Sequence, residues 1–233
     1  MRHFLAFLIL AGVKTFCHLF YRADFKWITP HPKNPWDKLR IIVLLNHTSL
    51  FEPLYIRVFS YRYLWYLSNH LNVPGADITL NRTFVGKFWK LMVPGIASVS
   101  RKQDSTWSSY LEGIKDSCVI MIAPEGRMKR PSGFDKSGKP MTVKIGIADI
   151  IEDLDQGGML LALSGGLHHI QKPGQHFPKL FKPINMNLAY LDIAQYKASF
   201  TGSIRERKLA MVADLQSRLE KDCPSIPSSQ LQL

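Results

Sequence analysis

The chain has 233 residues, which is enough for one α/β domain with a full hydrophobic core. It carries 30 Lys and Arg against 18 Asp and Glu, so its net charge of +12 predicts an anionic partner. The basic residues are dispersed and no DNA- or RNA-binding motif occurs, which argues against nucleic acid, whereas the apolar N-terminus favours an anionic membrane surface.

Residues 1–28 predict an N-terminal membrane-associating helix. Residues 4–13 form an apolar run that Lys14 interrupts, and a helix that spans a membrane needs about 20 apolar residues. We therefore expect a helix that lies in or dips into one leaflet, on the cytoplasmic face of the membrane. The alternative is a buried helix of a soluble core. Residues 29–38 are punctuated by prolines and predict a linker.

Residues 39–223 predict a single α/β domain in which strands and helices alternate. Strands are expected at 39–45, 63–68, 96–100, 118–123 and 159–163, with one or two further strands at 180–191. Helices are expected at 52–60, 84–92, 105–116 and 143–154, with a final helix capped by Ser203 and Glu206 whose inner face holds Leu209, Val212, Ala213 and Leu219. This order predicts a mostly parallel central sheet with helices on both faces. Residues 224–233 predict a disordered tail.

Polar residues follow three of the predicted strands. These are Asn46-His47, Ser100-Arg101, and Pro124-Glu125-Gly126-Arg127. In a parallel sheet the carboxyl ends of the strands meet at one edge, where ligands bind. A general base would then face a set of cations suited to a phosphate group.

The spacing of His47 and Glu52 supports catalysis in one geometry. On a single helix the two side chains would lie about 140° apart and could not meet. If His47 ends the strand and Glu52 begins the next helix, the carboxylate can orient the imidazole as it removes a proton from a hydroxyl. The alternative is that Ser49 and Glu52 form a capping box, which requires no catalysis.

Four short blocks, taken together, resemble the 1-acylglycerol-3-phosphate acyltransferase family over about residues 40–165. They are His47-x4-Glu52, Gly95-x5-Arg101, Pro124-Glu125-Gly126 and Lys144-Ile145-Gly146. That family transfers a fatty acyl group from coenzyme A or acyl carrier protein to a lipid hydroxyl at the membrane surface. The resemblance implies that His47 is the general base and that Glu52 orients it. It also implies that the acceptor and its phosphate are held by Arg101, Glu125, Gly126, Arg127, Lys129 and Arg130.

The chain departs from the family pattern at three places. Glu52 stands where the family usually has aspartate, and Arg127-Met128 stands where the third block usually continues with Thr-Arg. The predicted strand at residues 159–163 lacks the proline of the fourth block. Arg127 lies one residue before the arginine of the family pattern, so its guanidinium would point in another direction. These departures therefore affect the expected identity of the acceptor more than the expected reaction.

The expected activity is O-acyl transfer from acyl-CoA or acyl carrier protein to a lysophospholipid-like acceptor, in phospholipid biosynthesis or remodelling. Since a thiolate leaves readily, we expect no cofactor, and a Gly-x-Ser-x-Gly nucleophile motif is absent from the sequence. We expect no metal site, because His168-His169 and the three cysteines lack metal-ligand spacing. Two alternatives remain: a hydrolase or transacylase that uses the same base, and a catalytically inactive lipid-binding protein at the membrane surface.

Overall fold

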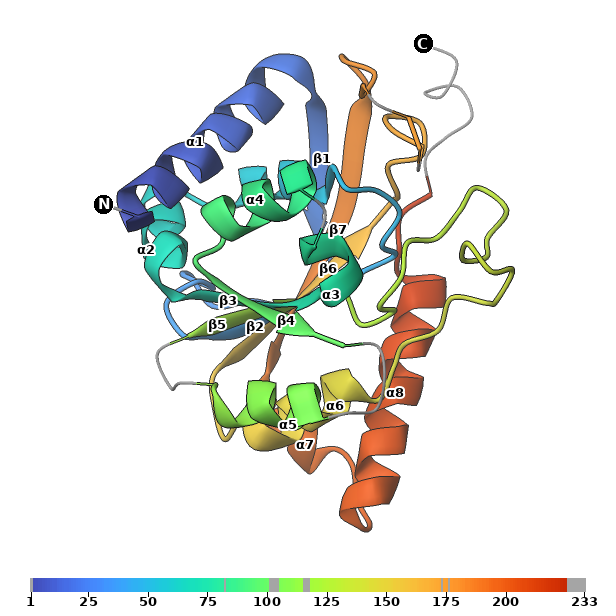
Figure 1. Ribbon diagram of the computed structural model, residues 1–233. Coiled ribbons are helices and arrows are strands. Elements are labelled where there is room, and N and C mark those ends of the chain that lie inside the picture. The colour runs from blue at the N-terminus through green and yellow to red at the C-terminus, as the bar shows by residue number, and fades with distance from the viewer. Residues whose placement is uncertain are drawn as a thin grey trace.

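The computed structural model describes residues 2–81, 83–100, 105–114, 118–172, 174–175 and 177–225, and within them a seven-stranded sheet runs through the centre (Figure 1). Its strand order is β1-β7-β6-β2-β5-β3-β4. The strands are β1 (Arg22–Trp27), β2 (Leu39–Leu45), β3 (Leu71–Ala76), β4 (Gly95–Val99), β5 (Val119–Ile122), β6 (Gly158–Ser164) and β7 (Pro183–Asp192). Strands β6 and β7 pair antiparallel and the other neighbours pair parallel, which confirms the predicted sheet.

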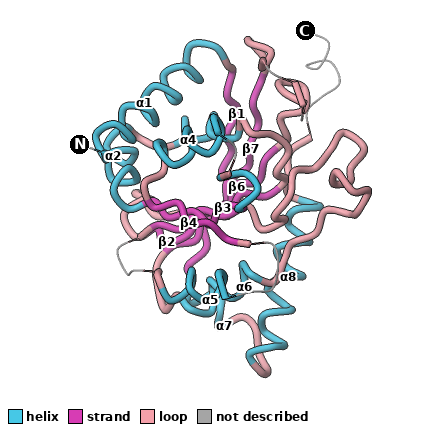
Figure 2. Tube along the Cα trace, in the orientation of Figure 1, coloured by secondary structure: helices cyan, strands magenta, loops and turns pink. Residues whose placement is uncertain are grey.

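Helices cover both faces of this sheet (Figures 1 and 2). One layer contains α1 (Arg2–Phe20), the 3-10 helix η1 (Glu52–Val58), α2 (Tyr61–His70) and α4 (Thr83–Met92). The opposite layer contains α5 (Ser105–Glu112), α6 (Gly146–Asp153), α7 (Ile193–Ala198) and α8 (Ile204–Lys221), while the short α3 (Asp77–Leu80) follows β3. Each layer has its own hydrophobic cluster against the sheet.

The side chains of the central strand β2 pack into both hydrophobic clusters, one on each face of the sheet. Successive side chains of a strand point to opposite faces. Ile42 accordingly packs in the cluster beneath α1 and α2, whereas Ile41 and Val43 pack in the cluster against α6 and α8. All three side chains are buried, so the leucine- and isoleucine-rich run 39–45 is a strand buried on both faces, as predicted.

Helix α1 packs one face on the protein and exposes the other. Ala6, Leu10, Lys14 and Cys17 are buried, and the Lys14 ammonium donates to the Arg57 carbonyl at 2.7 Å. On length and composition alone, α1 is long and apolar enough to cross a membrane. Its buried lysine faces protein, however, and the large apolar side chains that it exposes are Phe4, Leu5, Leu8, Phe16 and Leu19.

Three segments in the N-terminal half differ from the prediction, and one of them is β3, because no strand was predicted at residues 71–76. Residues 63–68, predicted as a strand, lie in α2, because Tyr63, Leu64 and Leu67 are buried at helical spacing and Ser60 caps the helix by accepting from the Tyr63 amide. Residues 22–27, predicted within the N-terminal helical segment, form β1, an edge strand beside β7. The division of the chain into an anchor, a linker and a catalytic domain stays a prediction.

The C-terminal helix α8 begins as predicted, but its buried side is formed by other residues than those predicted. Ser203 and Glu206 form the expected capping box. The fully buried residues are Met211 and Leu215, whereas the predicted inner residues Leu209 and Ala213 are exposed. Residues 226–233 of the predicted tail lie outside the described residues.

Candidate active site

The chain turns sharply where β2 ends, and this turn presents His47. Asn46 has φ +66°, a left-handed conformation that asparagine tolerates better than most residues. Its side-chain amide donates to the Ser164 carbonyl at the end of β6, at 2.8 Å. The turn is thereby tied to the neighbouring strand, and it sets the direction in which the next side chain leaves the sheet.

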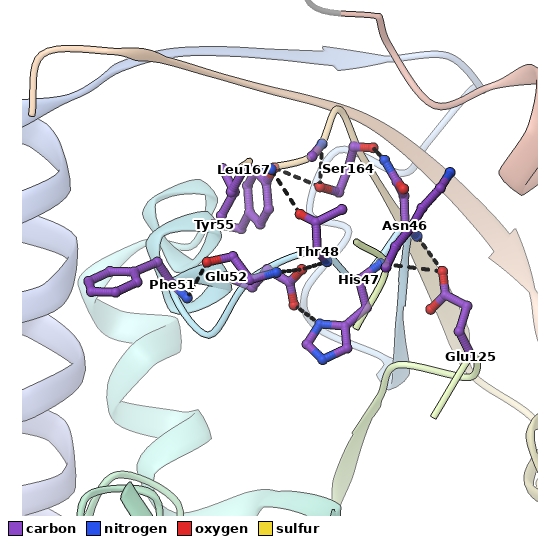
Figure 3. A network of polar contacts seen from close by, with 12 residues as sticks. Asn46, His47, Thr48, Phe51, Glu52, Tyr55, Glu125, Ser164 and Leu167 are labelled. Carbon is purple, nitrogen blue, oxygen red and sulfur yellow. Dashed lines mark hydrogen bonds and ion pairs between the residues drawn. The ribbon is translucent and has the colours of Figure 1, made fainter. Parts of the chain in front are cut away.

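His47 and Glu52 meet as the sequence predicts (Figure 3). The Glu52 carboxylate contacts His47 Nδ1 through Oε2, and its Oε1 accepts from the backbone amides of Thr48 at 2.6 Å and Ser49 at 3.3 Å. The glutamate is buried, whereas the imidazole is partly exposed. A carboxylate at Nδ1 favours the tautomer that carries its proton there, which leaves the basic lone pair on Nε2.

The capping alternative is formed only in part. The Ser49 hydroxyl accepts from the Phe51 amide at 3.1 Å and donates to Gln171 Oε1 at 2.7 Å, so it does not cap Glu52 reciprocally. Phe51, the N-cap residue of η1, makes no side-chain capping hydrogen bond. Glu52 therefore accepts hydrogen bonds from the backbone with one carboxylate oxygen and contacts the imidazole with the other.

Glu125 holds the same turn from the other side. Its Oε1 accepts from the backbone amides of Asn46 at 2.6 Å and His47 at 3.3 Å (Figure 3). The carboxyl group is buried, burial raises its pKa, and Oε2 has no hydrogen-bond partner among the described residues. Gly126 follows with φ +66°, which permits the tight turn after β5.

A buried network that the sequence analysis missed supports the turn from behind. Thr48 Oγ1 accepts from the Leu167 amide at 2.8 Å, and the hydroxyls of Tyr55 and Ser164 are 2.7 Å apart (Figure 3). Ser164 also accepts from the Gly166 amide at 2.9 Å. Ser164 could have been found, because it directly follows the predicted strand 159–163, just as His47 and Glu125 follow theirs.

Arg127, predicted to hold phosphate, contacts an acid of its own loop. Its guanidinium pairs with the buried Asp135 and donates to Ser137 Oγ at 3.1 Å. Asp135 also accepts from the backbone amides of Lys139 at 2.9 Å and Ser137 at 2.7 Å. The Lys139 amide, together with the Arg127 guanidinium, holds the pKa of Asp135 well below its ordinary value.

Of the other predicted binding residues, Lys129 contacts the catalytic turn through its backbone and Arg130 forms a backbone hydrogen bond within its own loop. The Lys129 amide donates to the His47 carbonyl at 2.7 Å, and the Lys129 carbonyl accepts from His168 Nε2 at 2.7 Å. The Arg130 amide donates to the Phe134 carbonyl at 2.7 Å within the loop. Arg101 lies outside the described residues. The structure thus brings together His47, Glu52, Glu125, Gly126 and Arg127, with the backbone of Lys129 beneath them.

His168 and His169 each contact a backbone carbonyl. His169 Nε2 lies 2.6 Å from the Pro183 carbonyl, and burial lowers the pKa of both His168 and His169. Within the described ranges, no cluster of three or more His, Cys, Asp or Glu residues is arranged to hold a metal ion.

A cavity of about 670 Å³ opens at the carboxyl ends of β2, β3, β4 and β5, beside His47. On the side of α1 and α4 its wall is apolar and includes Leu10, Leu67, Trp89, Met92 and Val93. Around His47 the lining is formed by Glu52, Gly126, Arg127, Met128 and Lys144. Past the sheet edge, towards α5 and α6, it is formed by Ser100, Trp107, Ser108, Ile145, Gly146 and Asp149. The imidazole therefore stands between an apolar space and a more polar one.

Comparison with known proteins identifies the fold. No family model matches the chain, and no curated protein sequence matches it. The structure is similar to the crystal structure of the 1-acyl-sn-glycerophosphate (LPA) acyltransferase PlsC from Thermotoga maritima, with a TM-score of 0.53 and 17% sequence identity. The alignment covers 94% of this chain and 82% of that chain. The likeness therefore extends over nearly the whole chain.

Proposed function

We propose that the protein transfers a fatty acyl group from an acyl thioester to a hydroxyl of a lysophospholipid-like acceptor, as members of the 1-acylglycerol-3-phosphate acyltransferase family do. The observation that carries this proposal is the His47–Glu52 pair, which lies at the edge of an apolar cavity of about 670 Å³. A space of that size and polarity suits a fatty acyl chain, and a carboxylate-oriented imidazole suits proton removal from a hydroxyl. The likeness to the LPA acyltransferase fold agrees with this activity.

The reaction follows from the roles of the two side chains. His47 Nε2 removes the proton from the acceptor hydroxyl, while Glu52 stabilises the imidazolium through Nδ1–H. The oxygen attacks the thioester carbonyl and gives a tetrahedral oxyanion. When the intermediate collapses, the carbon–sulfur bond breaks, the imidazolium returns the proton to the thiolate, and an ester and a free thiol result. The sequence of steps requires no covalent acyl-enzyme.

We also propose that the protein works at the cytoplasmic face of a membrane, with α1 lying in one leaflet. The outward face of α1 exposes five large apolar side chains, and Lys14 turns inward to the Arg57 carbonyl. Leu10 on the inner face of α1 lines the cavity, so the same helix separates the cavity from the surface. An acceptor and a product that are both lipids would then have a short path to the bilayer.

The test is incubation of the purified protein with acyl-CoA, acyl carrier protein thioester and a panel of lysolipids, followed by lipid mass spectrometry. A new ester that requires both a thioester and a lysolipid supports the proposal. His47→Ala should lower the rate at least about 100-fold while the circular dichroism spectrum is unchanged. Substitution of the exposed His31, whose Nδ1 lies 3.0 Å from the Pro32 carbonyl and whose ring packs beside Trp27, provides the control outside the site.

Other outcomes would assign the site differently. Release of free fatty acid without ester would indicate a hydrolase, and ester formation without a thioester would indicate a transacylase. Lipid binding with no turnover, unchanged by His47→Ala, would indicate an inactive lipid-binding protein. Wild-type turnover in a folded His47→Ala protein would rule out His47 as the base.

A further inference from the structure

A second, smaller cavity of about 430 Å³ lies where the start of α6 meets the first turns of α8. It is lined by Ile145, Ile204, Arg205, Lys208 and Leu209. Ile145 also lines the cavity that contains His47, so the two spaces share a wall. We refer to the smaller cavity as the α6–α8 groove.

The α6–α8 groove combines exposed aliphatic side chains with cations. Ile145, Ile204 and Leu209 are 46%, 59% and 54% exposed, and large apolar side chains gathered in this way mark an interaction site more often than isolated ones do. Arg205 is exposed and forms no ion pair or hydrogen bond with any side chain that the structure describes. Lys208 donates to Asp149 Oδ1 at 2.8 Å, so part of its charge is compensated.

The groove is connected to the catalytic turn by a short series of contacts. The Lys144 amide donates to the Pro124 carbonyl at 3.0 Å, which fixes the residue before Ile145 against the turn after β5. The next residue in that turn, Glu125, accepts from the His47 amide. Between groove and base, the larger cavity is lined by Lys144, Gly146 and Asp149. A ligand in the groove can therefore extend an arm along this lining towards His47.

We propose that the α6–α8 groove binds the nucleotide end of coenzyme A. The adenine would rest on the aliphatic side chains and the phosphates would face Arg205 and Lys208, while the pantetheine arm passes Gly146 and brings the thioester to His47. The acyl chain would then enter the apolar space under α1 and α4. This inference rests on the proposed acyl transfer and names the carrier of its donor.

The shape of the groove favours a small ligand over a carrier protein. Stable protein–protein contacts bury about 800 Å² on each partner, whereas small-molecule sites are concave and have volumes of about 300–1,000 Å³. The groove belongs to the second class by volume and is formed by only two helices. Its cations complement the phosphates of a nucleotide, and its aliphatic surface suits an adenine ring.

The first experiment measures binding of coenzyme A, without an acyl chain, to the full-length protein by isothermal titration calorimetry. Arg205→Glu should raise the Kd roughly 10- to 100-fold or more, because a charge-assisted contact becomes a repulsive one. Lys221→Glu is the matched control: it makes the same change of charge on α8, about 24 Å along the helix from Arg205. It should bind coenzyme A like the wild type. Arg205→Ala should show a smaller loss in the same direction.

A second measurement separates the groove from the chemistry. The rate is compared with acyl-CoA and with an acyl N-acetylcysteamine thioester, which lacks the nucleotide. Arg205→Glu should raise the KM for acyl-CoA and leave kcat/KM for the short thioester unchanged.

Three results would overturn the assignment. The first is an equal Kd for coenzyme A in Arg205→Glu and Lys221→Glu. The second is an equal loss of kcat/KM with acyl-CoA and with the short thioester in Arg205→Glu, and the third is turnover with acyl carrier protein thioester by a protein that does not bind coenzyme A. If coenzyme A binds in an Arg205-dependent way but no thioester donates its acyl group, the groove stands and the proposed acyl transfer fails.

Discussion

At the scale of single residues, Glu52 divides its two carboxylate oxygens between the backbone and the imidazole. Oε1 accepts the amides of Thr48 and Ser49, and Oε2 faces His47 Nδ1. The backbone bonds fix the carboxylate in place before any substrate arrives. One side chain thus shapes the turn and selects the histidine tautomer.

Glu52→Gln tests whether the charge is required. The glutamine oxygen can keep the bonds to Thr48 and Ser49, but its amide N–H₂ would then face Nδ1 and favour the tautomer with the proton on Nε2. That tautomer cannot accept the hydroxyl proton, so kcat should fall at least about 100-fold while the free energy of unfolding changes by about 1 kcal/mol or less. Steady-state kinetics and chemical denaturation measure both. A variant that loses stability but keeps its kcat would leave Glu52 a purely structural role.

Glu125 is expected to position His47 rather than to bind the acceptor. Glu125→Ala removes the acceptor of two buried amides, Asn46 and His47, and should cost about 1–3 kcal/mol for each donor left without a partner, together with a large loss of kcat. Glu125→Gln keeps an acceptor oxygen at the same place and should restore most of both. An acceptor KM that rises equally in the alanine and glutamine variants would instead show that the charge contacts substrate.

The Asp135 carboxylate predicts a pH dependence for the loop at residues 127–140. Its pKa is lowered in the folded protein, so the stabilisation that it provides is present above its ordinary value of 3.8 and is lost as the pH falls through the lower folded value. Asp135→Asn should therefore be less stable than the wild type at pH 7, and this difference should close below pH 3.8. Denaturation at a series of pH values measures it, with Asp155→Asn at an exposed loop position as control. A difference that persists at low pH would contradict the charge-based explanation.

At this scale the sequence predicts the contact between His47 and Glu52, which the structure contains, whereas their catalytic roles stay a prediction. His47 and Glu52 were paired correctly because a strand end and a helix start leave only one geometry for that spacing. The ion pair between Arg127 and Asp135 could not be predicted from the sequence. Asp135 is eight residues away from Arg127 in a loop without periodicity, and nothing in the local pattern indicates that the loop folds back on itself.

At the scale of elements, the outward face of α1 is the part of the fold that we expect to contact lipid. Leu5 and Leu8 are 42% and 48% exposed and lie one turn apart. Each leucine side chain that leaves water contributes about 1.5–3 kcal/mol, so Leu5→Glu/Leu8→Glu should weaken binding to anionic vesicles at least about 100-fold. Vesicle sedimentation of the full-length protein measures this.

The control for that experiment is a similar change on the opposite layer. Leu209→Glu replaces an exposed aliphatic residue of α8 and should leave sedimentation unchanged. Equal sedimentation by the α1 variant and the wild type would move the membrane contact away from α1, for instance to the basic loop at residues 127–140.

Secondary structure could be predicted where burial imposes a clear period. The strands β2, β5 and β6 and the helices α4, α6 and α8 were found within a few residues. Strand β1 was missed although Arg22–Trp27 alternates between polar and apolar residues, because it follows α1 after a single residue and was included in the helical segment 1–28. Helix α2 was taken for a strand because Tyr63, Trp65 and Tyr66 have high strand propensity, and tertiary packing overrides that propensity.

At the scale of the whole molecule, the net charge of +12 should make membrane binding sensitive to salt. Exposed charges are screened over about 8 Å at physiological ionic strength and about 3 Å at 1 M salt. Sedimentation with anionic vesicles should therefore fall steeply between these conditions, and sedimentation with zwitterionic vesicles should be weak and nearly unchanged. Identical salt curves for both vesicle types would mean that apolar contact alone accounts for binding.

The cavity beside His47 could not be predicted from the sequence. Its wall draws on residues from Leu10 to Met186, and the packing of two helical layers against one sheet determines where space remains. The sequence does indicate the edge at which such a space opens, because polar residues follow the strands β2 and β5. The volume and the apolar character of the cavity emerge only from tertiary structure.

The pairing of β1 with β7 has a bearing on how the chain assembles during synthesis. Arg22 is paired with Pro183, so β1 meets its partner only when most of the protein has been made. Helix α1 packs on η1 and α2, which leave the ribosome soon after it. At about 5–20 residues per second, several seconds separate the two events. During that interval β1 is an unpaired strand edge, open to pairing with another chain, and early capture of α1 by a bilayer would keep nascent chains apart until β7 arrives.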